Sequence, residues 1–177
     1  MAVLPRGANR LAAPSLPGVS AALTAAALAH AAPARVALAV TPGPADHARI
    51  YADLCALGHD SGVTPESFPT AVEDDVESIG TRARVITALA ASGGDGAASE
   101  PSVIVTSLHA LLQPAPAPDA LEAASLHLQV GERYAFEDVV ARLVAAGYER
   151  SMDVDAPGRL AVRGGLLDVW PPAAPVP

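Results

Sequence analysis

The stretch GRLAVRGGLLDVWP, residues 158–171, constrains the fold more than any other part of the chain. Leu160 and Val162 alternate with small or charged residues, which is the pattern of a strand with one buried face. Gly164 and Gly165 allow a tight bend, because neither carries a side chain that would clash. A nearly apolar run follows and ends at a proline, which cannot continue strand pairing. We therefore predict two short strands joined at a glycine hinge.

Composition limits both the size of the core and the class of partner. At 177 residues the chain suffices for one ordinary domain or two small ones. Aromatic residues make up only 3% of it, so we expect a core built from Val, Leu, Ile and Ala. A net charge of −8 argues against a broad nucleic-acid-binding face. The single cysteine, Cys55, excludes an internal disulfide, suits a reducing compartment and is expected to be a small buried residue on a helix.

The first half of the chain alternates between predicted strands and helices, which is typical of an α/β fold with a parallel sheet. Arg35–Val40 and Val103–Thr106 are short apolar runs, as in strands buried on both faces. A helix is expected after each strand, one through Leu57 and one, capped by Ser107, to Leu112. The other predicted elements are a helix over 22–31, a strand end at 67–69, and a helix over 81–91 that buries Val85, Ile86 and Leu89.

A proline-rich stretch, 113–118, is expected to be a stiff connector, and we place a domain boundary there. After it, Leu126–Val130 alternates like a strand with one solvated face. Five apolar residues between Phe136 and Val144 follow helical spacing and predict the clearest amphipathic helix in the chain. Tyr148–Val154 is expected to be a strand that leads into the glycine-hinged hairpin.

The hairpin segment resembles one in the transcription-repair coupling factors (Mfd) and in their relative, the excision-repair protein UvrB. The family pattern is roughly Gly-Glu-aromatic-Ala-Val-Arg-Gly-Gly-aliphatic-aliphatic-Asp-aliphatic-aromatic-Pro. Arg159 replaces the acidic residue and Leu160 the aromatic one. Upstream, 130–132 and 146–148 match the family in the same order. The matching positions include the three hinge glycines and run through Gly158, Ala161, Val162, Arg163, Gly164, Gly165, Asp168, Trp170 and Pro171.

The resemblance implies a particular domain organisation. Residues 1–114 are expected to form a vestigial P-loop-type, RecA-like parallel-sheet domain, and 115–120 a Pro-rich linker. Residues 121–177 are expected to form a small α+β domain of the UvrB interaction type that is incomplete at its C-terminus. The family continues into motor domains, so we expect the chain to be a fragment of a longer protein.

The stretch that resembles the family's phosphate loop, Ser15–Leu23, lacks the groups that bind phosphate. A working loop needs a Gly-rich turn, a Lys for the phosphates and a Ser or Thr for Mg²⁺. Ser15 stands where the first Gly is expected, and Ala21 and Ala22 occupy the Lys and hydroxyl positions. We therefore expect no ATP binding and no other cofactor.

No catalytic or metal-binding set is visible in the sequence either. The five histidines are scattered, and none has the spacing of a zinc site. The carboxylates of 73–77 are interpreted as a solvated acidic loop rather than a metal site. Arg84 matches a family arginine and is expected to be structural. We expect no enzyme activity from this chain, although the resemblance implies that a full-length relative is an ATP-dependent DNA translocase.

The resemblance also implies a protein partner, the damage-sensing ATPase UvrA. An arginine of the family's hairpin motif, matched here by Arg163, takes part in that contact, and Arg150, one strand earlier, is a second candidate. A solvated arginine without a partner is the alternative for both. Further family contacts lie on a strand beyond residue 177, so binding is expected to be weaker than that of a whole domain. RNA polymerase and DNA are partners through family regions absent here, and we expect a monomer.

Three alternatives remain open at this point. The chain is a piece of a UvrB-like excision-repair subunit, a nonfunctional remnant, or a secreted Ala/Pro-rich domain. The last is suggested by Arg6 and Arg10 before an apolar stretch, with a small-residue motif at 29–31. Prolines interrupt that stretch, and no unbroken apolar run reaches the length of a membrane span. We therefore expect a cytoplasmic protein.

Overall fold

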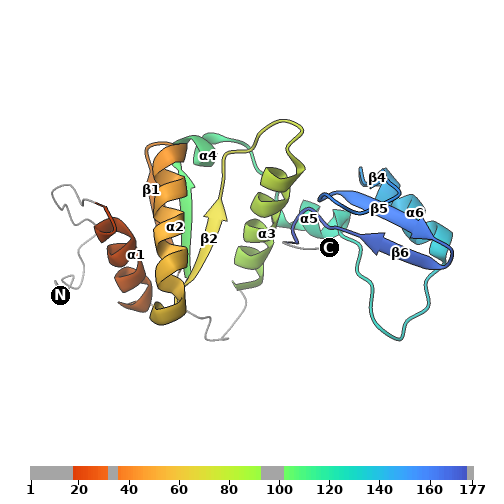
Figure 1. Cartoon of the computed structure of the whole chain (residues 1–177), viewed down its shortest axis with the longest axis horizontal. Helices are drawn as coiled ribbons and strands as arrows, with labels where there is room; N and C mark the ends of the chain where they lie inside the picture. Colours follow the sequence, from red (N-terminus) through yellow and green to blue (C-terminus); the bar gives the residue numbers. More distant parts are fainter. Residues whose placement is uncertain (1–17, 32–35, 93–101, 175–177) are drawn as a thin grey trace.

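Two small sheets organise the chain, one in each half (Figure 1). The computed structural model describes residues 18–31, 36–92 and 102–174. The strands of the first sheet are all parallel, in the order β1-β3-β2. The second has the order β4-β5-β6, with β4 parallel and β6 antiparallel to β5. The predicted α/β class is therefore confirmed.

The first half contains α1 (Ser20–Ala31), β1 (Ala37–Thr41), α2 (Pro44–Ser61), β2 (Thr64–Phe68), α3 (Val76–Ser92), β3 (Ser102–Ser107) and α4 (Leu108–Leu112). The second half contains α5 (Pro118–Ala124), α6 (Phe136–Ala145), β4 (Glu149–Arg150), β5 (Arg159–Arg163) and β6 (Leu166–Val169). α5 begins inside the predicted linker, because Pro118 lies in the first turn of the helix, where its missing N–H has no cost. The division into domains at 115–120 stays a prediction.

The core of the first half lies between the sheet and the helices α1 and α2. Val103 and Val105 of the central strand β3 are fully buried there, as predicted for that strand. β1 departs from its prediction, since Leu38 is 55% and Val40 48% exposed. The strand lies at the edge of the sheet, and α1 and α2 cover only the face that carries its alanines. The continuous apolar sequence of β1 therefore does not correspond to a strand buried on both faces.

Helix positions in the first half follow the predicted stripes with two exceptions. Leu54 and Val85 are buried as expected, and the Ser107 hydroxyl caps α4 by accepting a hydrogen bond of 3.1 Å from the Ala110 amide. Cys55 is exposed, because it lies about 100° around α2 from Leu54 and outside the buried stripe. Another exception is found near the end of α3, where Leu89 is exposed rather than buried.

Arg82 of α3 joins several segments of the first half. Its guanidinium donates to the carbonyls of Pro69, Ala110 and Pro114 at 2.9, 3.2 and 3.3 Å. The same group stacks 4.1 Å from the centre of the Phe68 ring, and the residue is only 4% exposed. Burial lowers the pKa of Arg82, but a guanidinium stays charged at neutral pH. The end of β2, the end of α4 and the chain leading to α5 therefore all depend on one cation.

In the second half, α6 packs on one face of the β5–β6 hairpin, around the fully buried Leu160. Val139 and Leu143 supply the helix side of this core, as the spacing predicted. The predicted strand 126–130 does not form, and the segment is irregular. Leu126 packs against the core around Leu160, whereas Leu128 and Val130 are exposed. The strand predicted over 148–154 shortens to β4, after which the chain turns back toward the hairpin.

The two halves meet where α3 contacts the chain that follows β6. A Cβ added to Gly80 would lie 2.1 Å from the carbonyl oxygen of Pro172, so only glycine fits at this point of α3. Nearby, a Cβ on Gly158 would lie 3.0 Å from Val76 at the start of the same helix. Trp170 closes the turn after β6 by donating from its indole nitrogen to the Ala174 carbonyl at 3.0 Å. α3 is thus shared by both halves.

Replacing Arg82 by Ala is expected to lower the free energy of unfolding by about 2–4 kcal/mol, because buried carbonyls lose their charged donor. Arg82→Lys should recover only part of this, since an ammonium lacks the planar fork and the ring contact. Urea denaturation measures both. Arg84→Ala is the control: Arg84 forms a single 3.2 Å pair with Glu66 that is only partly buried, and its loss should cost less than about 1 kcal/mol. Equal losses at the two positions would contradict the assigned role of Arg82.

Gly80→Ala is expected to push the 171–174 segment away from α3, although alanine favours helix by about 1 kcal/mol. The emission of Trp170, the only tryptophan, should shift to longer wavelength, and stability should fall by about 1–3 kcal/mol. Gly43→Ala is the matched control, because its Cβ would meet nothing within 4 Å and its φ is −154°. An unchanged emission spectrum for Gly80→Ala would refute the contact.

Candidate partner-binding site

The predicted glycine-hinged hairpin is present in the structure. β5 and β6 pair antiparallel, with Arg163 opposite Leu166 across the turn. Gly164 has φ +60°, a conformation open to glycine and strained for other residues. A positive φ at the first of two turn residues is what a type II′ hairpin turn requires. The hinge thus forms, as predicted, because glycine tolerates a backbone conformation that other residues do not.

Arg163 projects from the face of the hairpin opposite α6. Leu160 and Val162 point toward the helix, so Arg159, Ala161 and Arg163 lie on the other face. The Arg163 side chain is 56% exposed. Its Nη2 atom donates to the Met152 carbonyl at 2.9 Å and to the Asp153 carboxylate at 2.5 Å. The guanidinium is therefore at the surface, but it has partners within the chain.

The segment between β4 and β5 is tied to this outer face by two ion pairs. Asp153 pairs with Arg163 near the turn, and Asp155 pairs with Arg159 at the start of β5. Ala161 between the two arginines is 1% exposed. The segment 151–157 thus follows β5 back along the sheet, although the sequence predicted that its first part would continue as a strand.

Two exposed apolar residues adjoin Arg163, one through its backbone carbonyl and the other as its cross-strand neighbour. Met152, whose carbonyl accepts from the guanidinium, is 87% exposed, and Leu166, the cross-strand neighbour of Arg163, is 70% exposed. Side chains directly opposite each other in an antiparallel pair lie on the same face. An arginine that adjoins exposed apolar residues has the composition of a protein-contacting surface, where arginine and methionine are enriched.

Arg150 is not brought together with Arg163. β4 pairs parallel with β5 so that Arg150 is in register with Leu160. Because side chains alternate between faces, this register places Arg150 on the opposite face of the sheet from Arg163. The residue is exposed at the sheet edge. The two predicted partner-binding arginines therefore cannot belong to one flat contact surface.

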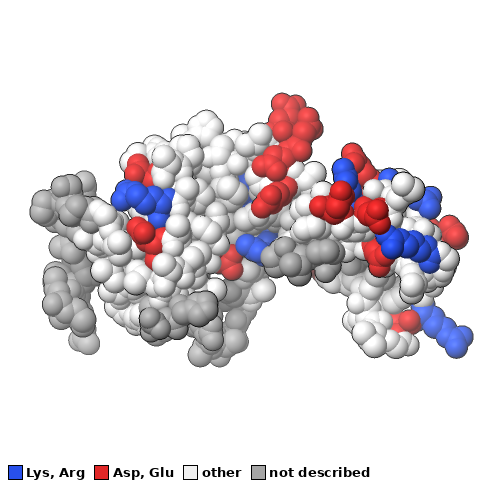
Figure 2. All heavy atoms as spheres, in the orientation of Figure 1, with Lys and Arg blue, Asp and Glu red and all other residues white. Residues whose placement is uncertain are grey.

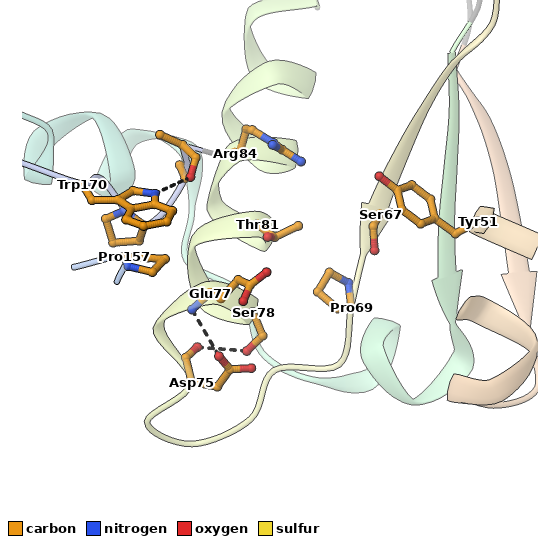
Figure 3. A pocket seen from close by; sticks show the side chains of 13 residues that line it. Tyr51, Ser67, Pro69, Asp75, Glu77, Ser78, Thr81, Arg84, Pro157 and Trp170 are labelled. Carbon is orange, nitrogen blue, oxygen red and sulfur yellow. Dashed lines mark hydrogen bonds between the residues drawn. The ribbon is translucent and has the colours of Figure 1, made fainter. Parts of the chain in front are cut away.

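A groove of about 580 Å³ lies beside α3, where the two halves meet (Figure 3). Its floor includes Thr81 and Arg84 of α3, and Trp170 lies on one side and Tyr51 on the other. Arg84 faces its 3.2 Å partner Glu66 on β2. The groove mixes both charges with an indole and a phenol ring.

A hydroxyl–imidazole pair, Ser67 and His47, ties β2 to α2. The Ser67 Oγ and His47 Nε2 atoms are 3.1 Å apart, and the ring also bonds to the Val105 backbone. Burial lowers the pKa of His47, which keeps the imidazole neutral at pH 7. Where a base acts on a nucleophile, a third group such as a carboxylate orients it, and here the backbone takes that place. We assign the pair a structural role, which the sequence spacing gave no reason to expect.

The acidic loop lies at the N-terminal end of α3, and Figure 2 shows a cluster of carboxylates there, at the top of the view. Asp75 Oδ1 accepts from the Glu77 amide at 3.2 Å, so part of the cluster satisfies the first turn of the helix. In the described ranges, no three His, Cys, Asp or Glu side chains converge as metal ligands would. None of the helices described is both long and apolar enough to cross a membrane.

Residues 126–176, which contain the hairpin, α6 and the turn after β6, match the family described as the UvrB interaction domain. The transcription-repair-coupling factor of Mycobacterium bovis is 39% identical over 102 residues, which is 58% of this chain and 8% of that protein. The one from Bacillus subtilis is 33% identical over 72 residues, or 41% of this chain and 6% of the relative. The resemblance to the transcription-repair coupling factors is confirmed.

A second kind of relative shares a shorter segment. The UvrABC system protein B of Aromatoleum aromaticum is 53% identical over 47 residues, which is 26% of this chain and 7% of that protein. The matched segments thus cover less than a tenth of the length of each of these curated relatives. The match with the mycobacterial coupling factor is about twice as long as the segment 126–176, so it extends into the first half of the chain.

Gly164→Ala is expected to lower the free energy of unfolding by about 1–2 kcal/mol, because φ +60° is strained for alanine. The neighbouring Gly165→Ala is the matched control. Its Cβ would meet nothing within 4 Å, and its φ is not positive, so its cost should stay below about 0.5 kcal/mol. Thermal or urea unfolding of both variants measures the difference, and equal stabilities would show that the hinge does not depend on the left-handed residue.

Proposed function

We propose that this chain is the non-catalytic N-terminal part of a transcription-repair coupling factor, which binds UvrA to recruit nucleotide excision repair to stalled transcription. The observation that carries the proposal is the exposed Arg163 on a glycine-hinged hairpin, inside the segment that matches the UvrB interaction domain. A guanidinium offers five N–H donors in a planar fork that suits a carboxylate of a partner protein. Arg163 is the contact residue, and Arg150 on the opposite face contributes little.

A role without ATP chemistry agrees with the described part of the first half. Ala22, at the position where a phosphate loop carries its hydroxyl, is fully buried against the core of α1 and α2. Ser15–Pro17 of the predicted vestigial loop lie outside the described residues. RNA polymerase, DNA and the motor activity belong, in this proposal, to parts of the family that the match does not cover.

Two other functions are less well supported. A UvrB-like subunit is favoured by the match with the Aromatoleum protein, but that match covers only 47 residues. The coupling-factor match of 102 residues extends beyond the domain that both families share. A secreted protein cleaved near Ala31 would lose α1, whose Ala22, Ala26 and Ala29 form one side of the first core. A protein that keeps α1 and acts in the cytoplasm is the simpler assignment.

The proposal is tested by measuring the affinity of the chain for purified UvrA. Arg163→Ala should weaken binding about tenfold or more, because a charged anchor at the centre of an interface is lost. Arg142→Ala, an exposed arginine on α6, controls for the removal of one positive charge and should bind like the parent. Arg150→Ala is expected to change the affinity by less than about threefold.

Circular dichroism must show that the Arg163 variant is folded before its affinity is interpreted. Equal binding by the parent and Arg163→Ala would remove Arg163 from the interface. No binding by the parent at any accessible concentration would overturn the proposed function itself.

A further inference from the structure

The unbound chain already supplies the Arg163 guanidinium with acceptors. The Nη2 atom carries two hydrogens, and it has two acceptors, the Met152 carbonyl at 2.9 Å and the Asp153 carboxylate at 2.5 Å. Both donors of this nitrogen are therefore engaged. The Asp153 side chain is 80% exposed, so it is held by the arginine rather than by burial.

A bidentate contact with a carboxylate needs two parallel N–H groups on neighbouring nitrogens. In a guanidinium such pairs are formed by Nη1 with Nη2 or by Nε with the terminal nitrogen on its side. Because Nη2 is saturated by Met152 and Asp153, the end-on fork is closed in the unbound chain. A partner that grips Arg163 through this fork must first displace one of the two acceptors.

We infer that Asp153 occupies the position of a partner carboxylate, and that Arg163, Met152 and Leu166 form one docking surface for a carboxylate set in an apolar surface. This inference rests on the proposed function and names the chemistry that the surface of UvrA must offer. Asp153 is the acceptor that leaves, since its ion pair is open to solvent and exposed pairs are weak. Met152 and Leu166 then supply apolar contacts around the new ion pair.

The apolar part of this surface follows from the hairpin register. Leu166 is directly opposite Arg163, and its 70% exposure leaves most of the side chain without contacts in the chain. Met152 is 87% exposed and adjoins the guanidinium through its own carbonyl. A flexible thioether suits contact with an irregular partner surface. Burying both groups around the arginine would exclude water from the ion pair and strengthen it.

A matched carboxylate, Asp155, lies two residues farther along the same segment. Asp155 pairs with Arg159, which lies at the start of β5 and farther from the glycine turn, whereas Leu166 is the cross-strand partner of Arg163. Removing the charge of Asp155 changes the net charge of the chain as much as removing that of Asp153. A general effect of charge on association therefore acts equally on both variants, whereas release of Arg163 occurs in one of them only.

The test measures binding of the intact chain to purified UvrA by titration calorimetry, for the parent, Asp153→Asn, Asp155→Asn and Leu166→Ala. Asp153→Asn should bind about two- to fivefold more tightly, because the competing acceptor has lost its charge. Asp155→Asn should stay within about 1.5-fold of the parent. Leu166→Ala should bind about three- to tenfold more weakly, through loss of buried apolar area.

The outcomes separate this inference from the proposed function. Binding by the parent with Asp153→Asn equal to it or weaker overturns the inference alone, because the carboxylate then positions the arginine instead of competing for it. An equal gain for Asp153→Asn and Asp155→Asn also overturns it, since net charge would explain both. Absence of binding by every variant overturns the proposed function, and the inference with it.

Discussion

The burial of one cation in α3 determines much of the architecture. Arg82 has to satisfy its guanidinium away from water, and backbone carbonyls from three separate segments provide the acceptors. Those carbonyls come from the loop after β2, the end of α4 and the start of the chain toward α5. Because a charged donor orients all of them, the position of α3 relative to the sheet is fixed at the point where β2 ends. The Phe68 ring beneath the guanidinium holds it from the side.

The position of α3 in turn affects the second half of the chain. Gly80 lies two residues before Arg82, and only its lack of a side chain lets the Pro172 carbonyl approach the helix. Glycine inside a helix is unfavourable by itself, so its presence indicates a packing requirement. The chain after β6 therefore rests on α3, and Trp170 closes the turn beside it. The hairpin is thereby held beside α3, at the side of the first half from which α5 also starts (Figure 1).

The sequence predicted correctly those elements that depend on interactions between residues close together in the chain. The glycine turn, the amphipathic helix through Leu143, the buried strand β3 and the Ser107 cap depend on neighbouring residues, and each is found. The elements that failed depend on distant partners. The alternation of 126–130 needs an adjacent strand to form a sheet, and the apolar residues of β1 need a helix on both faces. Arg82 was missed because three of its partners are backbone atoms, which leave no pattern of charges in the sequence.

At the candidate site too, the sequence identified the key residue but not the residues that surround it in the fold. The motif identified Arg163, and the alternation of side chains along β5 places it on the outer face. Arg150 is in register with Leu160 and therefore lies on the other face. No sequence pattern indicated Asp153, because 148–154 was predicted to be a strand, in which Asp153 would have no reason to fold back onto β5. The short length of β4 is what turns that carboxylate toward the guanidinium. A two-residue strand therefore sets the unbound state of the arginine, and any partner has to compete with a neighbour that only the fold brings within reach.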